Sequence, residues 1–213
     1  MSDTREHLQT LTEIRSLMER SSKFLSLSSL SGVSAGLIAL AGAGAAYARL
    51  HTDYFDGLAN VPVLNGAGRR AELSFLLTDA VLVLLLALGC GIFFTVRRAR
   101  QQGHTVWNPT SRRLLWAMAG PLVAGGLFCL GLIYHGLIWL TFPATLIFYG
   151  LALLSGSKYT VRDVAYLGVL EVALGLLALV LTGYSLLMWA IGFGVLHIVY
   201  GLLMYVKYER RAA

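Results

Sequence analysis

The sequence predicts an all-α, polytopic membrane protein: six transmembrane helices arranged as three tandem helical hairpins, preceded by an amphipathic helix. Three observations predict this fold class. Only 13% of the 213 residues are charged, about half of the roughly 25% typical of soluble domains. Six apolar runs are each long enough, at about 1.5 Å per residue, to cross a hydrocarbon layer of about 30 Å. Lysine and arginine gather in alternate loops, as a fixed topology in a bilayer requires.

The first 23 residues are polar but keep a helical repeat of apolar side chains, so we expect a cytoplasmic amphipathic helix over 1–23. That repeat consists of Leu8, Leu11, Ile14 and Met18. The transmembrane domain is expected over 24–206, and residues 207–213 form a short cytoplasmic tail. The six spans are predicted near 24–48, 74–96, 114–134, 137–154, 164–182 and 185–206.

Two of the turns between spans are tight, and they centre on His135-Gly136 and Thr182-Gly183. Helices joined so closely lie side by side and antiparallel. Pro121 falls inside the third span and is expected to bend it, because a proline removes one backbone hydrogen bond.

The basic residues predict the orientation. Of the 17 lysines and arginines, only Arg49, Arg69 and Arg70 fall on one side of the membrane, and all the others fall on the side of the two termini. The positive-inside rule therefore predicts cytoplasmic N- and C-termini. The densest basic group fits either this topological role or binding of anionic lipid headgroups, and it consists of Arg97, Arg98, Arg100, Arg112 and Arg113. The chain has no soluble domain large enough for a nucleic-acid-binding fold, so we expect no nucleic-acid partner.

A short pattern recurs in the first, third and fifth spans, which favours three hairpins inserted in the same orientation. It reads Gly36-Leu37-Ile38-Ala39-Leu40, then Gly126-Leu127-Phe128-Cys129-Leu130, then Gly175-Leu176-Leu177-Ala178-Leu179. The last two hairpins match further, at an offset of about fifty residues: Tyr134 and Trp139 are spaced like Tyr184 and Trp189, and Tyr149-Gly150-Leu151 corresponds to Tyr200-Gly201-Leu202. The alternative is a chance match, because glycine and leucine are frequent in such spans.

The run from Gly175-Leu176-Leu177-Ala178-Leu179 through Trp189-Ala190-Ile191-Gly192 to Tyr200-Gly201 resembles the repeat of HdeD-like proteins, which are bacterial six-helix membrane proteins. The resemblance is best over 164–206, weaker over 114–154 and faint over the first hairpin. It implies a helical bundle in the bacterial inner membrane. It also implies a stress-related role, because the type member of the family is associated with acid resistance. The family usually has a proline where this chain has Thr182-Gly183, and the motif transfers no catalytic residue.

Glu171 and His197 are the residues most informative about function. Glu171 lies about eight residues inside the fifth span, where an ionisable group is costly unless it faces the bundle or water. Counting from the turn near Gly183 puts Glu171 and His197 at similar depth on antiparallel neighbours, so we expect the two side chains to meet. Glycines flank both at spacings of three and four, which lets helices approach closely; they are Gly168 and Gly175 around Glu171, and Gly194 and Gly201 around His197.

Two interpretations of this pair stay open. One is a proton-linked or transport site, because His and a buried carboxyl titrate near neutral pH. The other is interhelical packing, since a neutral polar contact in a membrane contributes about 1 kcal/mol. Asp79 and His135, both near the outer surface, extend the candidate polar path if they meet. The alternative for Asp79 is a local bond to Arg69, Arg70 or the backbone.

Other chemistry is weakly indicated. His51, Asp53 and Asp56 are a weak candidate metal site, because carboxylate and imidazole groups bind metals but their spacing matches no strong signature. We find no phosphate-binding loop, nucleophile elbow, zinc-protease motif or dinucleotide fingerprint. We therefore expect no enzyme activity and no cofactor.

The sequence thus predicts a non-enzymatic inner-membrane protein of the acid or envelope-stress type, pH-responsive through a buried Glu-His pair. Two alternatives remain. A small transporter or channel predicts a continuous polar cavity reaching mid-membrane. An oligomeric membrane scaffold predicts a sealed bundle with a large interface between copies.

Overall fold

The computed structural model describes residues 29–50, 67–101 and 106–210, and every regular element in these ranges is helical. Six helical stretches are long and apolar enough to cross a membrane, which confirms the predicted fold class. The expected surface helix over 1–23 and the candidate metal ligands His51, Asp53 and Asp56 lie outside the described residues.

The first five spans are single α-helices, and the sixth is composite. The α-helices are α2 (Ser29–Leu50), α3 (Ala67–Gln101), α4 (Pro109–Tyr134), α5 (Thr141–Gly156) and α6 (Asp163–Val180). The sixth span comprises α7 (Ser185–Trp189), the π-helix η5 (Ala190–Leu196), α8 (His197–Met204) and the π-helix η6 (Tyr205–Glu209). Short 3-10 turns connect the elements, namely η2 (Ile138–Leu140), η3 (Ser157–Tyr159) and η4 (Thr182–Tyr184).

Two helices are longer than the sequence predicts, because hydropathy marks the hydrocarbon layer and not the helix. α3 extends beyond the expected 74–96 span at both ends, through polar but helix-compatible residues. α4 begins five residues before the expected position. There, the Asn108 side chain accepts a hydrogen bond from the Ser111 backbone N–H (2.8 Å), and the Ser111 hydroxyl accepts one from the Asn108 N–H (3.0 Å). This reciprocal pair caps the helix, which then continues through Pro121.

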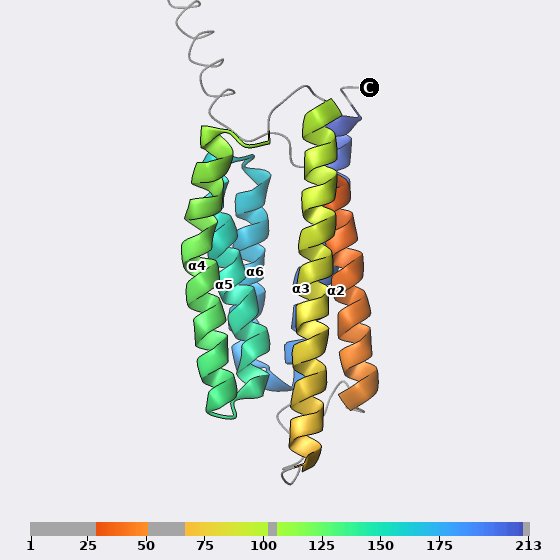
Figure 1. The fold of residues 1–213 in the computed structure, drawn as a ribbon, viewed down its shortest axis with the longest axis vertical. Helices are drawn as coiled ribbons and strands as arrows, with labels where there is room; N and C mark the ends of the chain where they lie inside the picture. Colours follow the sequence, from red (N-terminus) through yellow and green to blue (C-terminus); the bar gives the residue numbers. More distant parts are fainter. Residues whose placement is uncertain (1–28, 51–66, 102–105, 211–213) are drawn as a thin grey trace, which may run out of the picture.

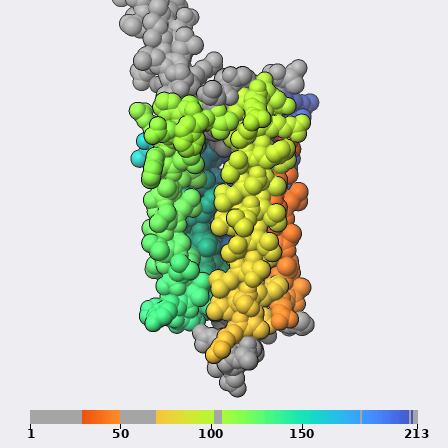
Figure 2. Space-filling view, viewed as in Figure 1, coloured from red at the N-terminus to blue at the C-terminus, as the bar shows by residue number. Residues whose placement is uncertain are grey.

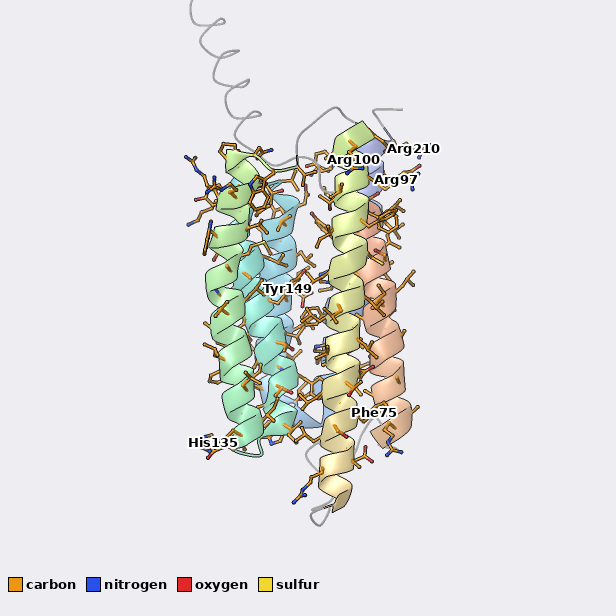
Figure 3. The ribbon with its side chains drawn as sticks, viewed as in Figure 1. Phe75, Arg97, Arg100, His135, Tyr149 and Arg210 are labelled. Carbon is orange, nitrogen blue, oxygen red and sulfur yellow. The ribbon has the colours of Figure 1, made fainter. Side chains whose placement is uncertain are left out.

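The bundle has two distinct ends. Arg97, Arg100 and Arg210 lie at one end, and Phe75 and His135 lie toward the other (Figure 3). We call the first the arginine-rich end. At the opposite end the α4–α5 turn closes over Gly136, whose φ of 78° is a conformation that favours glycine.

The helices form two groups joined by the sixth span. α5 packs between α4 and α6, and α2 packs on α3 (Figure 1). The elements of the sixth span contact α2 on one side and α5 and α6 on the other. α3 and α4 do not pack on one another, and a space-filling view shows them as two ridges separated by a furrow (Figure 2).

Candidate functional site

The structure brings Glu171 and His197 together inside the bundle. Glu171 on α6 is fully buried, and His197 at the start of α8 is 6% exposed. The imidazole Nδ1 lies 3.4 Å from the Glu171 carboxyl Oε1. This is the contact expected from counting outward from the turn, and it lies well inside both spans.

Two further contacts fix the orientation of the His197 ring. Nδ1 lies 3.0 Å from the Gly192 carbonyl oxygen, and Nε2 lies 2.8 Å from the Tyr149 hydroxyl on α5. A carbonyl oxygen only accepts, so Nδ1 carries a proton and donates it to Gly192. In the neutral imidazole Nε2 is then the acceptor, and the Tyr149 hydroxyl donates to it.

Gly192 makes room for the carboxyl group. A Cβ atom at this position would lie 2.6 Å from the Glu171 Oε2. Gly192 belongs to the π-helix η5, in which the backbone N–H of His197 bonds to Gly194 while the imidazole bonds to Gly192. Single π-helical turns inside α-helices often mark functional sites.

The Glu171 carboxyl is poorly satisfied. Neither carboxyl oxygen has a hydrogen-bond partner among the described residues, and the 3.4 Å approach to His197 is an ion-pair distance without hydrogen-bond geometry. A buried carboxyl without such partners is expensive in either charge state and much more so when ionised alone. The energy of this site therefore depends on how many protons Glu171 and His197 share.

An aromatic column connects the pair to the end of the bundle opposite the arginine-rich end. The Phe193 ring stacks on His197 with centroids 5.9 Å apart and an interplanar angle of 17°. Trp189 lies one turn further along, with its ring 5.0 Å from that of Phe193. Tyr149 also contacts Phe193, at 4.9 Å. A shift of the imidazole would therefore be transmitted to Trp189 through direct ring contacts.

The four glycines predicted around the pair pack elsewhere. Gly168 and Gly175 face α5, while Gly194 and Gly201 face α2. They hold α6 and α8 against these outer neighbours and do not line a direct α6–α8 contact. Close helix approach at these glycines was predicted, but the helix that each one faces was not, because spacing along one helix gives depth and not direction.

Asp79 and His135 are not brought together. Asp79 lies on the face of α3 toward α2, where a Cβ on Gly42 would be 3.4 Å from its Oδ2. His135 is exposed at the end of α4, its ring edge-on to Tyr134 at 5.3 Å (Figure 3). Because α3 and α4 lie apart, these residues do not extend a polar path toward Glu171.

The basic group lies where the sequence places it, at the arginine-rich end. Arg112 on α4 borders a hollow of about 520 Å³ with Trp107, Leu115, Trp116 and Ala119. An arginine beside exposed tryptophans suits the headgroup zone of a bilayer. Lipid binding by Arg97, Arg98, Arg100, Arg112 and Arg113 stays a prediction. Among the described residues no group of three or more metal-ligating side chains exists.

Sequence reasoning missed Tyr149 and Gly192. The same depth count that paired Glu171 with His197 would have found Tyr149, because it lies mid-span on α5. Nothing in the sequence pointed to Gly192, since its role depends on the π-helical turn.

The fold and this site define a polytopic helical membrane protein with a buried carboxyl–imidazole–tyrosine cluster. No protein-family model, curated protein or solved structure matches the chain.

Proposed function

We propose that this chain is a pH-responsive protein of the bacterial inner membrane, of the acid or envelope-stress type, whose proton-binding element is the cluster of Glu171, His197 and Tyr149. The observation that carries the proposal is a fully buried carboxyl group 3.4 Å from an imidazole and without hydrogen bonds of its own. The resemblance to HdeD-like proteins supports the stress-related class. The distribution of arginines supports termini in the cytoplasm.

Protonation of this cluster changes its hydrogen-bond pattern. Because Nδ1 of His197 is committed to Gly192, a proton that binds to the ring must go to Nε2. Nε2 then donates to the Tyr149 oxygen, and the hydroxyl hydrogen has to turn to another acceptor. At the same time the imidazolium gains a Coulomb attraction to an ionised Glu171, which is strong in a low-dielectric interior. Where Glu171 is ionised, protonation of His197 therefore favours a closer Glu171–His197 contact.

The groups facing the cluster are mostly apolar. Tyr200 on α8 is the further titratable group within electrostatic reach of Tyr149 among the described residues. α2 presents Gly32, Gly36 and Leu40 to the sixth span. With no opposing charge from these elements, protonation of the pair itself dominates the local electrostatics.

Burial favours a sensor over the transporter alternative. A transport path predicts a mid-membrane site open to water on at least one side, whereas Glu171 has no exposed surface. A proton reaches such a site through brief openings of the bundle, which is adequate for sensing but slow for transport.

Fluorescence of Trp189 provides the test. A variant with Trp107, Trp116 and Trp139 replaced by Phe keeps one tryptophan, and its emission is followed from about pH 4 to about pH 9 in lipid nanodiscs. We expect a sigmoidal change that His197→Gln abolishes and Glu171→Gln displaces. A wild-type emission that stays flat over this range, with the protein folded by circular dichroism, would refute the proposal.

A further inference from the structure

Two interfaces between hairpins are built from triplets of the same pattern, a small residue, a valine four positions later and a glycine three positions after that. The α6 triplet packs on α5 and consists of Gly168, Val172 and Gly175. A Cβ on Gly150 of α5 would lie 2.7 Å from both the Gly168 carbonyl oxygen and the Val172 Cγ2. A Cβ on Gly175 would lie 2.9 Å from the Pro143 carbonyl oxygen. Such contacts bring two backbones together and stabilise helix pairs in lipid.

The α2–α8 interface repeats this arrangement. Ser29, Val33 and Gly36 have the same spacing on α2. A Cβ on Gly201 of α8 would lie 2.7 Å from the Ser29 carbonyl oxygen and 2.8 Å from the Val33 Cγ2. A Cβ on Gly36 would lie 2.6 Å from the Gly194 carbonyl oxygen. In both interfaces the first helix of one hairpin meets the second helix of another, antiparallel to it.

The triplet occurs a third time, on α4, where no other described residue covers its Val123 and Gly126. It consists of Ala119, Val123 and Gly126. Val123 is 61% exposed, and a Cβ on Gly126 would meet no atom within 4 Å. The hollow beside Arg112 and Ala119 continues the same flank.

The matching second-helix surface is on α3 and is also uncovered by the part of the chain that the structure describes. Gly89 is exposed, with nothing within 4 Å of an added Cβ. It occupies the flank of α3 that Gly150 occupies on α5. On α3, Val83 lies against α2, and Ala87, one turn beyond it, is two residues before Gly89. On α5, Phe148 lies against α4 and is two residues before Gly150. The third interface of the series would therefore pair Gly89 with the triplet on α4.

Both surfaces lie at the same depth. Gly89 is twelve residues from the arginine-rich end of α3, about 18 Å, and Val123 is fourteen residues from that end of α4, about 21 Å. The two helices that carry them, α3 and α4, border the furrow on its two sides (Figure 2).

We propose that a second copy of this chain occupies the furrow, so that α3 of each copy packs on α4 of the other across a two-fold axis along the membrane normal. Two copies inserted the same way present these helices antiparallel and at equal depth, as the other two interfaces require. The symmetry is closed, because each copy offers both surfaces.

Closing the furrow within one chain would disturb contacts that already exist. α3 is held to α2 through Gly42, and α2 is held to α8 through Gly32 and Gly201. Moving α3 onto α4 of its own chain would pull α2 away from α8 or α3 away from α2. A second copy meets both surfaces without breaking either contact.

Cysteine cross-linking in native membranes tests the proposal. In a background with Cys90→Ser and Cys129→Ser, one chain carries Leu86→Cys and a differently tagged chain carries Val123→Cys. We expect a covalent dimer between the two tagged chains after oxidation. As a matched control, Val123→Cys is paired with Leu176→Cys, an exposed position at similar depth on α6, and should give no such product.

Two glycine substitutions on α4 test whether the contact depends on close approach of the helices. Gly126→Leu should reduce the cross-linked dimer by roughly tenfold or more, equivalent to about 1.4 kcal/mol. Gly120→Leu, which lies outside the triplet and is equally free of contacts among the described residues, should not. Two results would overturn the proposal: a cross-link only within a chain that carries both cysteines, which means internal closure, or no cross-link at all, which means that lipid fills the furrow.

Discussion

A carboxyl group inside a membrane-spanning bundle keeps its position only if the surrounding backbone leaves space for it. Here Gly192 leaves that space, and the same residue supplies the carbonyl that orients the His197 ring. The depth of Glu171 and His197 could be predicted from the sequence, since counting along antiparallel helices needs only the position of the turn. The contribution of Gly192 could not be predicted, because the position of this residue beside Glu171 arises from a local change in helical pitch.

Gly192→Ala should destabilise the protein and disturb the cluster. The added methyl group would lie 2.6 Å from the Glu171 Oε2 and against Leu146, which is fully buried, so neither neighbour can move away easily. Such overpacking typically costs about 1–3 kcal/mol. Thermal unfolding in nanodiscs measures the loss. Gly120→Ala is the control, and an equal effect of both variants would mean that the crowding at Gly192 is unimportant.

Tyr149→Phe should shift the pH response. The phenylalanine ring keeps the contact with Phe193 but cannot accept a hydrogen bond from the imidazolium Nε2. A bond to a charged donor contributes about 1.5–3 kcal/mol and a neutral one about 0.5–1.5 kcal/mol, so the protonated state loses more. The midpoint of the Trp189 titration should therefore move to lower pH, by up to about one unit. An unchanged midpoint would remove Tyr149 from the cluster.

At the scale of helices, the chain uses one contact triplet in three places and buries only two of them. The six spans could be predicted because apolar length is a direct requirement of the bilayer. The pairing of helices could not be predicted, since a glycine in one helix does not identify the helix that packs on it. Gly168 and Gly175 flank Glu171 in the sequence, and only the structure shows that the helix they pack on is α5.

The buried and open triplets should differ in their tolerance of a methyl group. Gly168→Ala places a Cβ 2.8 Å from the Gly150 carbonyl oxygen, a backbone atom that cannot give way, and we expect a loss of about 1–3 kcal/mol. Gly126→Ala places its Cβ in open space and should leave the unfolding of the isolated monomer unchanged. Unfolding in detergent at high dilution compares the two, and equal losses would mean that the α4 triplet is not open in the monomer.

At the scale of the whole molecule, the arrangement of charge decides how the bundle sits in the bilayer. Arg97 and Arg100 on α3 lie at the same end of the bundle as Arg210, which is far from them in the sequence (Figure 3). At the other end Arg49 is held by Glu72 at 3.2 Å, so it presents less net charge to the surface. This asymmetry favours the arginine-rich end in the cytoplasm, because translocating several guanidinium groups is unfavourable.

Thiol labelling checks this orientation. In the background lacking Cys90 and Cys129, Arg100→Cys and His135→Cys place one exposed thiol at each end of the bundle. A membrane-impermeant maleimide added to intact spheroplasts should label His135→Cys and leave Arg100→Cys unlabelled until the membrane is permeabilised. The opposite pattern would put the termini on the outer face. It would also mean that protons reach Glu171 and His197 from the opposite side of the membrane, since both residues lie between these two ends.

Labelling of both sites without permeabilisation would indicate two insertion orientations. The proposed two-fold pairing of α3 with α4 would then fail for half of all encounters, because it requires both copies to be inserted the same way.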